Sequence, residues 1–285
     1  MSAIELTFEE LVNIPPSNVI LPIRRVASHN FGFQSSTAKG RGMEFDEVRP
    51  YVPGDDVRNI DWRTTARTGK PHTKMYREER DRCTYILTDL TETMYFGSTG
   101  QLKARVAAVL TASVAWQALL NQDKVSNMLL INDEIARTTP GGRNHDVLEI
   151  IKQVREYYYL GLENSESSKT IEDGLVLLSE NVRPGSVIYV ISDFYRMSPK
   201  AATILRYLNR NHIVFCYQIF DKLEIEITNS GSLYVDNGSS VGYVVSNDKK
   251  FAEDYRKIGM HRMRVLSTQL KHSCQRFIRI DASKQ

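Results

Sequence analysis

Ser186-Val-Ile-Tyr-Val-Ile-Ser-Asp193 is the stretch of this sequence that carries most information about the fold. Its apolar run is typical of a strand that lies inside a parallel sheet and is buried on both faces. Pro184-Gly185 marks a turn just before the run, and an acidic residue ends it. Tyr85-Ile-Leu-Thr-Asp89 is a second β-rich run with the same acidic end. These two runs predict central parallel strands with carboxylates at one edge of the sheet.

Strand-like and helix-like segments alternate on both sides of these runs. This alternation predicts an α/β, Rossmann-like fold with a mostly parallel sheet that is covered by helices on both faces. Helical periodicity covers residues 102–120, 147–159, 170–182, 200–209 and 251–272, and further strands are expected at 125–131, 135–138, 213–220 and 277–280.

Two parts of the chain depart from the alternation. Residues 1–80 are rich in turns and opposite charges, which predicts a β-rich N-terminal elaboration ahead of an α/β domain over residues 81–285. Residues 223–245 contain β-rich segments around Asn237-Gly238, which is a strong signal for a β-hairpin turn. We therefore expect a hairpin insertion within the α/β domain.

Charge and composition exclude several classes of function. The 285 residues include 37 basic and 34 acidic side chains, a balance that does not favour binding to nucleic acid. The most apolar segment, 106–120, is interrupted by polar residues and is too short to span a membrane. No signal peptide is recognisable at the N-terminus, and the three cysteines form no CxxC pair. These features predict a cytoplasmic protein.

Carboxylate and hydroxyl groups gather at the predicted strand ends. In open α/β sheets, ligands bind beyond the carboxyl ends of the strands. Asp89, Thr91 and Thr93 follow the first strand, Asp193 ends the later one, and Thr170 begins a helix. These hard oxygen donors suit Mg²⁺. An ion held mainly by neutral hydroxyls would attract an Asp or Glu from a partner protein.

The same residues resemble a known metal site. Asp89-x-Thr91-x-Thr93, followed by Thr170 and by Asp193, is similar to the metal-ion-dependent adhesion site of von Willebrand A domains, whose pattern is Asp-x-Ser-x-Ser, Thr and Asp. The resemblance implies Mg²⁺, Mn²⁺ or Ca²⁺ as the bound ion. Both serines of that pattern are threonines here, which keeps the oxygen but adds a methyl group that restricts the side chain.

A longer resemblance lies upstream. Gly40-Arg-Gly-Met-Glu44-Phe-Asp-Glu-Val-Arg49-Pro-Tyr-Val-Pro-Gly-Asp55-Asp56-Val-Arg58-Asn-Ile-Asp61-Trp62-Arg63 is similar to the signature of the bacterial domain of unknown function 58 family, and the similarity continues into the C-terminal helix. It implies a von Willebrand A-like core with an added β-structured part. Members of this family are commonly encoded beside MoxR-type AAA+ ATPases, and the resemblance implies that such an ATPase is a partner in maturing or assembling other proteins.

The signature segment itself has two interpretations. Acidic and basic residues interleave around Pro53-Gly54, which predicts a loop held by ion pairs and anchored by a buried Trp62. The alternative is a surface that binds a partner directly. The residues concerned are Glu44, Arg49, Asp55, Asp56, Arg58, Asp61 and Trp62.

Together these observations predict a non-enzymatic module that binds protein through a metal-assisted site. One alternative is a structural scaffold without metal. Another is a Mg²⁺-dependent phosphohydrolase that uses Asp89 as nucleophile, in the manner of haloacid-dehalogenase-like enzymes. Those enzymes need Asp-x-Asp, and Thr91 occupies the second position here, which removes the general acid. The sequence also lacks His-Glu-x-x-His and Gly-x-Ser-x-Gly motifs.

Overall fold

The computed structural model describes residues 4–14, 43–78, 82–163, 168–227, 232–236, 241–245 and 249–284. The chain divides into two compact units. The larger, here the core unit, comprises residues 1–21 and 82–285; the smaller, here the signature unit, comprises residues 22–81. Within the described ranges, none of the helices has the length and apolar character needed to cross a bilayer.

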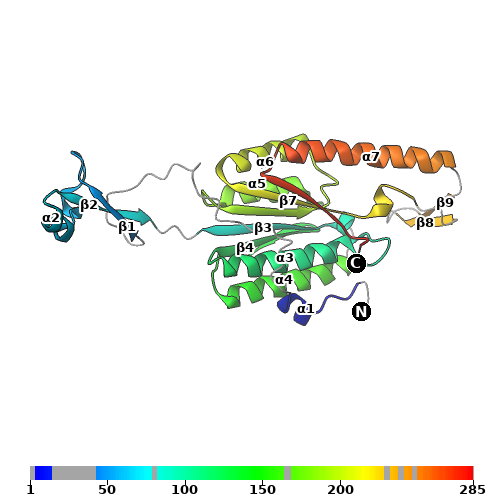
Figure 1. Ribbon diagram of the computed structural model, residues 1–285. Helices are drawn as coiled ribbons and strands as arrows, with labels where there is room; N and C mark the ends of the chain where they lie inside the picture. The colour runs from blue at the N-terminus through cyan, green and yellow to red at the C-terminus, as the bar shows by residue number, and fades with distance from the viewer. Residues whose placement is uncertain are drawn as a thin grey trace. The chain divides into compact units, whose positions relative to one another are not determined.

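A six-stranded sheet organises the core unit (Figure 1). The edge strand β5 runs antiparallel to β4, and every other pairing is parallel. This arrangement confirms the predicted α/β fold with a mostly parallel sheet. In spatial order the strands are β10 (Arg276–Asp281), β7 (Ile213–Phe220), β6 (Val187–Ser192), β3 (Cys83–Leu90), β4 (Lys124–Ile131) and β5 (Glu134–Arg137).

Helices cover both faces of this sheet. Figure 1 shows α3 and α4 on one face and α5, α6 and α7 on the other. The alternation of side chains along β3 explains this division, because Leu87 joins the apolar core under α5 and α6, whereas the Thr88 hydroxyl lies 2.7 Å from that of Thr111 in α3. The helices are α3 (Lys103–Leu120), α4 (Asn144–Glu163), α5 (Ile171–Asn181), α6 (Pro199–Asn211) and α7 (Lys249–Lys271).

The chain reverses its direction of travel across the sheet between β3 and β6. From β3 it proceeds through β4 to β5 on one side, and it then returns to build β6, β7 and β10 on the other. In doubly wound sheets such a reversal opens a crevice beyond the strand ends. Thr88 pairs with Ile191 across the two strands. The acids that follow them, Asp89 and Asp193, therefore lie at this crevice.

Two further segments belong to the core unit. The N-terminal segment, which contains helix α1 (Phe8–Val12), is held by long-range hydrogen bonds, among them one from the Tyr158 hydroxyl to the carbonyl of Ile4 at 2.8 Å. The start of the predicted elaboration over residues 1–80 thus packs on the core unit. Strands β8 (Ser232–Asp236) and β9 (Val241–Val245) pair antiparallel; the Asn237-Gly238 turn predicted between them lies outside the described residues.

The signature unit is a β-hairpin with two short helices. Strand β1 (Met43–Pro50) pairs antiparallel with β2 (His72–Glu78), and η1 (Val57–Asn59) and α2 (Trp62–Thr68) lie between them. Glu44 stands opposite Arg77 in this pairing. Helix α2 ends at Gly69, whose φ of 70° is readily adopted by glycine.

The acidic residues of the signature organise its turns. The Asp55 carboxylate accepts from the Arg49 guanidinium at 2.8 Å and from the backbone of Val52 at 3.0 Å. Asp56 caps η1 by accepting from the Arg58 N–H. Asp61 caps α2 and also accepts from the Thr64 hydroxyl. Local capping and the Arg49–Asp55 ion pair therefore hold this loop.

The prediction that Trp62 anchors the segment is wrong, because 69% of its surface is exposed. Trp62 is the first residue of α2, and its sequence, Trp-Arg-Thr-Thr-Ala-Arg-Thr, offers no apolar stripe to a core. No residue of this helix is buried. The caps and the hairpin hold α2 in place without the indole.

Trp62→Ala should therefore change the free energy of unfolding by no more than about 0.5 kcal/mol, as is usual for exposed positions. Leu87→Ala, in the buried centre of β3, should cost about 2–5 kcal/mol. Urea unfolding of the full chain measures both. A loss of several kcal/mol in the Trp62 variant would show that the indole is buried in solution.

Candidate functional site

The five residues predicted to bind metal line one small pocket at the strand ends. Asp89 lies near the end of β3, Thr91 and Thr93 follow it, Asp193 comes directly after β6, and Thr170 precedes α5. The pocket has a volume of about 10 Å³, which is roughly the room that one water molecule or a small ion needs. Here the structure brings together every residue of the predicted site.

Asp89 is buried and held from both sides. Its Oδ1 accepts hydrogen bonds from the backbone N–H and the hydroxyl of Thr91, at 3.0 and 2.7 Å. Its Oδ2 accepts from the Ser192 hydroxyl at 2.6 Å, and the Ser192 oxygen in turn accepts from the Phe194 N–H. Phe194 has a φ of 55°, a left-handed conformation that is uncommon for a bulky residue and marks strain at this loop.

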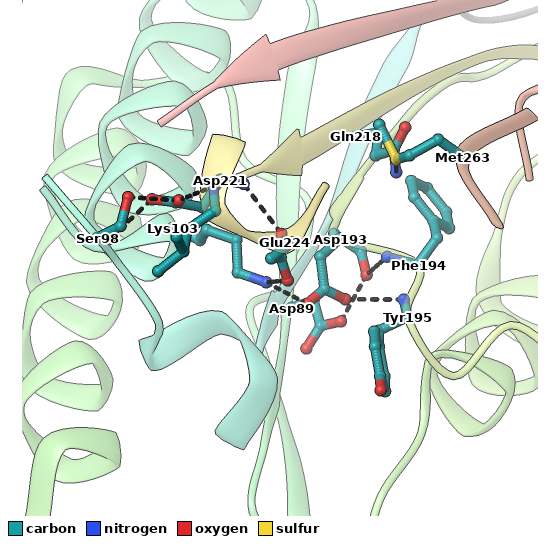
Figure 2. Close-up of polar contacts among 12 residues, drawn as sticks. Asp89, Ser98, Lys103, Asp193, Phe194, Tyr195, Gln218, Asp221, Glu224 and Met263 are labelled. Atoms are coloured by element: carbon teal, nitrogen blue, oxygen red, sulfur yellow. Dashed lines mark hydrogen bonds and ion pairs between the residues drawn. The ribbon is translucent and has the colours of Figure 1, made fainter. Parts of the chain in front are cut away.

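Asp193 is paired with a buried lysine that the sequence analysis missed. The Lys103 ammonium donates to Asp193 Oδ2 at 2.8 Å and to Glu224 Oε1 at 2.7 Å, as Figure 2 shows. Only 1% of the lysine side chain is exposed. The other oxygen of Asp193 accepts from the Tyr195 N–H at 2.8 Å. A fixed positive charge therefore sits beside the predicted metal ligands.

A second layer of hydrogen bonds fixes Glu224. Its Oε2 accepts from the Asp221 N–H at 2.9 Å, while the Asp221 carboxylate accepts from the N–H and the hydroxyl of Ser98 at 2.8 and 2.5 Å (Figure 2). Asp221 is fully buried and also caps the short helix η3 (Lys222–Glu224). The loop after β7 is thus tied to the loop that leads into α3.

Burial and charge shift the pKa values of two of these groups. Burial, and then the negative charge of Asp193, raise the pKa of Asp89 to about 6, although hydrogen bonds from Ser192 and Thr91 act in the opposite direction. Burial alone would lower the pKa of Lys103, but the carboxylates of Asp193 and Glu224 more than offset this and raise it. Lys103 is therefore charged at neutral pH.

The donor set of the pocket fits a small hard cation. Within the described ranges, no three His, Cys, Asp or Glu side chains converge in a manner suited to a metal ion, so hydroxyl groups have to supply part of the coordination shell. Thr91, Thr93 and Thr170 carry such hydroxyls beside the two carboxylates. The Thr170 hydroxyl donates to the Asp173 carboxylate at 2.9 Å, and its oxygen accepts from the Asp173 N–H in the capping box of α5, which leaves one lone pair for an ion. Mg²⁺ prefers oxygen ligands of this kind.

Lys103 carried one signal that the sequence analysis did not use. It is the first residue of α3, where the positive end of the helix dipole disfavours a cation. A lysine at the start of a mainly apolar helix needs compensation from elsewhere. Its partners follow 90 and 121 residues later in the chain, so sequence spacing alone could not identify them.

Residues 47–264 match the profile of a family described as "Protein of unknown function DUF58". The matched range begins inside the signature and extends through most of α7. The chain belongs to the DUF58 family. This confirms the resemblance seen in the signature residues.

The relatives and solved structures to which this chain is similar do not name an activity. An uncharacterized protein of Mycobacterium tuberculosis is 26% identical over 239 residues, which cover 80% of this chain and 72% of that protein. The conserved hypothetical protein BatB from Bacteroides thetaiotaomicron shows 13% identity and a TM-score of 0.43, over 70% of this chain and 90% of that one. The SpRpn10 VWA domain shows 12% identity and a TM-score of 0.38, over 72% and 91%.

Asp89→Asn should change how stability depends on pH when metal is removed with EDTA. The folded carboxyl has a pKa of about 6 against 3.8 when unfolded, so between these values the folded state binds more protons and stability falls as pH rises. Across this interval the free energy of unfolding of the wild type should fall by up to about 3 kcal/mol relative to that of the variant. Urea unfolding from about pH 4 to 7 measures the difference. Parallel profiles would mean that Asp89 titrates normally.

Proposed function

We propose that this DUF58 chain is a non-enzymatic protein-binding module whose strand-end pocket holds Mg²⁺, or Mn²⁺ or Ca²⁺ in its place. The observation that carries the proposal is the convergence of Asp89, Thr91, Thr93, Thr170 and Asp193 on one pocket from separate parts of the chain. When bound, the ion would supply a Lewis-acidic position for a carboxylate. An Asp or Glu of the partner would complete the coordination shell.

The charges around the pocket support an acidic ligand. Lys103 already neutralises part of the negative charge of Asp193, so a divalent ion there would keep a net attraction for an incoming anion. Lys169 and Arg196 also line the pocket. These side chains would favour a carboxylate from outside and disfavour a basic ligand.

The partner that we propose is a MoxR-type AAA+ ATPase, or a client protein that presents Asp or Glu. The support is the family membership together with the gene neighbourhood that the resemblance implies. Within this proposal the chain acts in the cytoplasm and without nucleic acid. The pocket would grip the partner, and the ATPase would supply the energy for remodelling.

The Lys103 ion pairs favour a second candidate function, a scaffold that works without metal. The ammonium lies where it already compensates Asp193 and Glu224, and the Asp89 oxygens are satisfied by hydroxyl and amide donors. A pocket compensated in this way can be stable with no ion in it. Titration with metal separates the two candidates.

Hydrolysis by Asp89 is the less favoured alternative. A carboxylate nucleophile needs an oxygen free to attack, whereas both oxygens of Asp89 accept hydrogen bonds from Thr91 or Ser192. Thr91 also stands where the family of Asp-x-Asp phosphatases has its general acid. Phosphatase assays should be blank, and hydrolysis that disappears in Asp89→Asn would make the chain an enzyme.

Metal binding should depend on the pocket residues. Isothermal titration with Mg²⁺, Mn²⁺ and Ca²⁺ should give weak binding to wild type, none to Asp89→Ala, and reduced binding to Thr91→Ala with Thr170→Ala, because these variants remove oxygen donors. Thr268→Ala, which removes an exposed hydroxyl on α7, is the matched control and should bind as wild type. The same heats in Asp89→Ala as in wild type would exclude this pocket as the metal site.

Capture of the ATPase should follow metal binding. Pull-down of the purified MoxR-type ATPase from the same genome should weaken with EDTA and in Asp193→Ala, provided that the melting temperature shows the variant to be folded. Thr268→Ala should again behave as wild type. Capture that is indifferent to EDTA and to Asp193→Ala would place ATPase binding elsewhere on the chain.

A further inference from the structure

The signature unit exposes an unusual group of side chains on its two short helices. Val57 in η1 is 61% exposed and Trp62 in α2 is 69% exposed. Arg58, Arg63 and Arg67 are exposed on the same two helices. We call these five residues the η1–α2 surface. Val57 and Trp62 are large apolar residues that lie close together in the sequence and are flanked by arginines. Their joint exposure needs a physical reason.

The neighbouring acids neutralise these arginines only in part. Asp55 is paired with Arg49, and the Asp61 carboxylate accepts from the Arg63 N–H and from the Thr64 hydroxyl. Asp56 caps η1, and its nearest approach to the Arg58 guanidinium is 3.9 Å, with 91% of that arginine exposed. An ion pair between side chains that are this exposed contributes little to the free energy of folding. Asp56 and Asp61 keep their negative charges, so the three arginines leave the η1–α2 surface with a small excess of positive charge.

We propose that the η1–α2 surface is a docking site for an acidic protein segment that carries an apolar side chain. Tryptophan and arginine are the residues most enriched among those that dominate binding energy at protein interfaces. An indole provides a large apolar area, and arginines around it select a partner with Asp or Glu. The physical assignment is thus Trp62 as the apolar anchor and Arg58, Arg63 and Arg67 as the charge selectors.

The composition favours a protein over a nucleic acid or a membrane. Val57 is exposed, and Val52 is 53% exposed. Their aliphatic side chains cannot stack on nucleic-acid bases, which pack against aromatic rings. The whole chain has 37 basic against 34 acidic residues, which gives no extended field for a phosphate backbone. A helix of two turns also offers too little apolar area to bind lipid.

The η1–α2 surface and the strand-end pocket would hold a ligand by different interactions. It needs no metal, so binding should persist in EDTA, and it depends on exposed charges, so binding should weaken with salt. The inference therefore stands or falls independently of the proposed metal site. Asp89→Ala should bind the probes below as wild type does.

The local charge can be tested by fluorescence quenching of the full chain. Trp116→Phe leaves Trp62 as the only tryptophan, since the chain has two. Because arginines attract anions, iodide should quench Trp62 more strongly than caesium does, and this preference should disappear in Arg63→Glu with Arg67→Glu. Equal quenching by both ions, or no quenching by either, would overturn the assignment of an exposed indole in a positive surface.

The ligand class can be tested with random peptides displayed on phage and selected on the full chain. Synthetic versions of the selected peptides should combine Asp or Glu with an apolar residue and should lose at least about tenfold in affinity in Trp62→Ala and in Arg63→Glu with Arg67→Glu. Tyr207→Ala, which removes an aromatic ring that is 58% exposed on α6, should bind as wild type. Circular dichroism confirms that each variant is folded.

Three outcomes would overturn the proposal. The first is that the selected peptides lack acidic residues, and the second is that they bind Trp62→Ala as tightly as wild type. The third is that no peptide is selected, whereas single-stranded RNA or vesicles of anionic lipid bind the wild type and bind Trp62→Ala less tightly. The last outcome would assign the surface to a nucleic acid or a membrane.

Discussion

The buried ammonium of Lys103 is the interaction on which the strand-end region depends. Removing this charge from water costs several kcal/mol, and only the two carboxylates at 2.7 and 2.8 Å offset that cost. The pairing also sets positions, because Lys103 begins α3, Asp193 follows β6 and Glu224 ends η3. Three segments far apart in the sequence are therefore fixed to one another by charge, and the hydrogen bonds of Asp221 to Ser98 extend the same constraint outward.

This constraint also shapes what the pocket can bind. Two carboxylates, Asp193 and Glu224, pair with the one ammonium of Lys103, so an excess of negative charge remains when both are ionised. Under the proposed function, that excess would attract a divalent ion, but less strongly than a site without the lysine would. The proposed weak metal binding follows from this charge balance. The hydroxyls add oxygen donors without adding charge.

Much of the fold and of the pocket could be predicted because both depend on short-range patterns. A β-rich run predicted β3 and an apolar run predicted β6, and parallel pairing brings the ends of both strands to one edge of the sheet, which is why Asp89 and Asp193 lie in one pocket. Lys103 escaped prediction because its partners are set by tertiary packing over about a hundred residues. Trp62 was misassigned for a different reason: tryptophan is usually well buried, but capping by Asp61 and Gly69 stabilises α2 without any use of its side chain.

Under the two proposals, the exposed Trp62 and the buried Lys103 would serve an acidic partner in opposite ways. At the strand ends, positive charge is buried and mostly compensated, so any attraction for a carboxylate has to come through an added ion or through the pocket rim. On the signature unit, the acids are used in capping and pairing while the arginines stay in water, where attraction acts at a distance and speeds encounter but is screened by salt. A partner that carried acidic segments for both could be recruited first by the exposed arginines and then held at the pocket, since the first attraction is long-ranged and the second requires contact. Because the two sites draw on different physical terms, a change in salt and a change in metal would act on them separately.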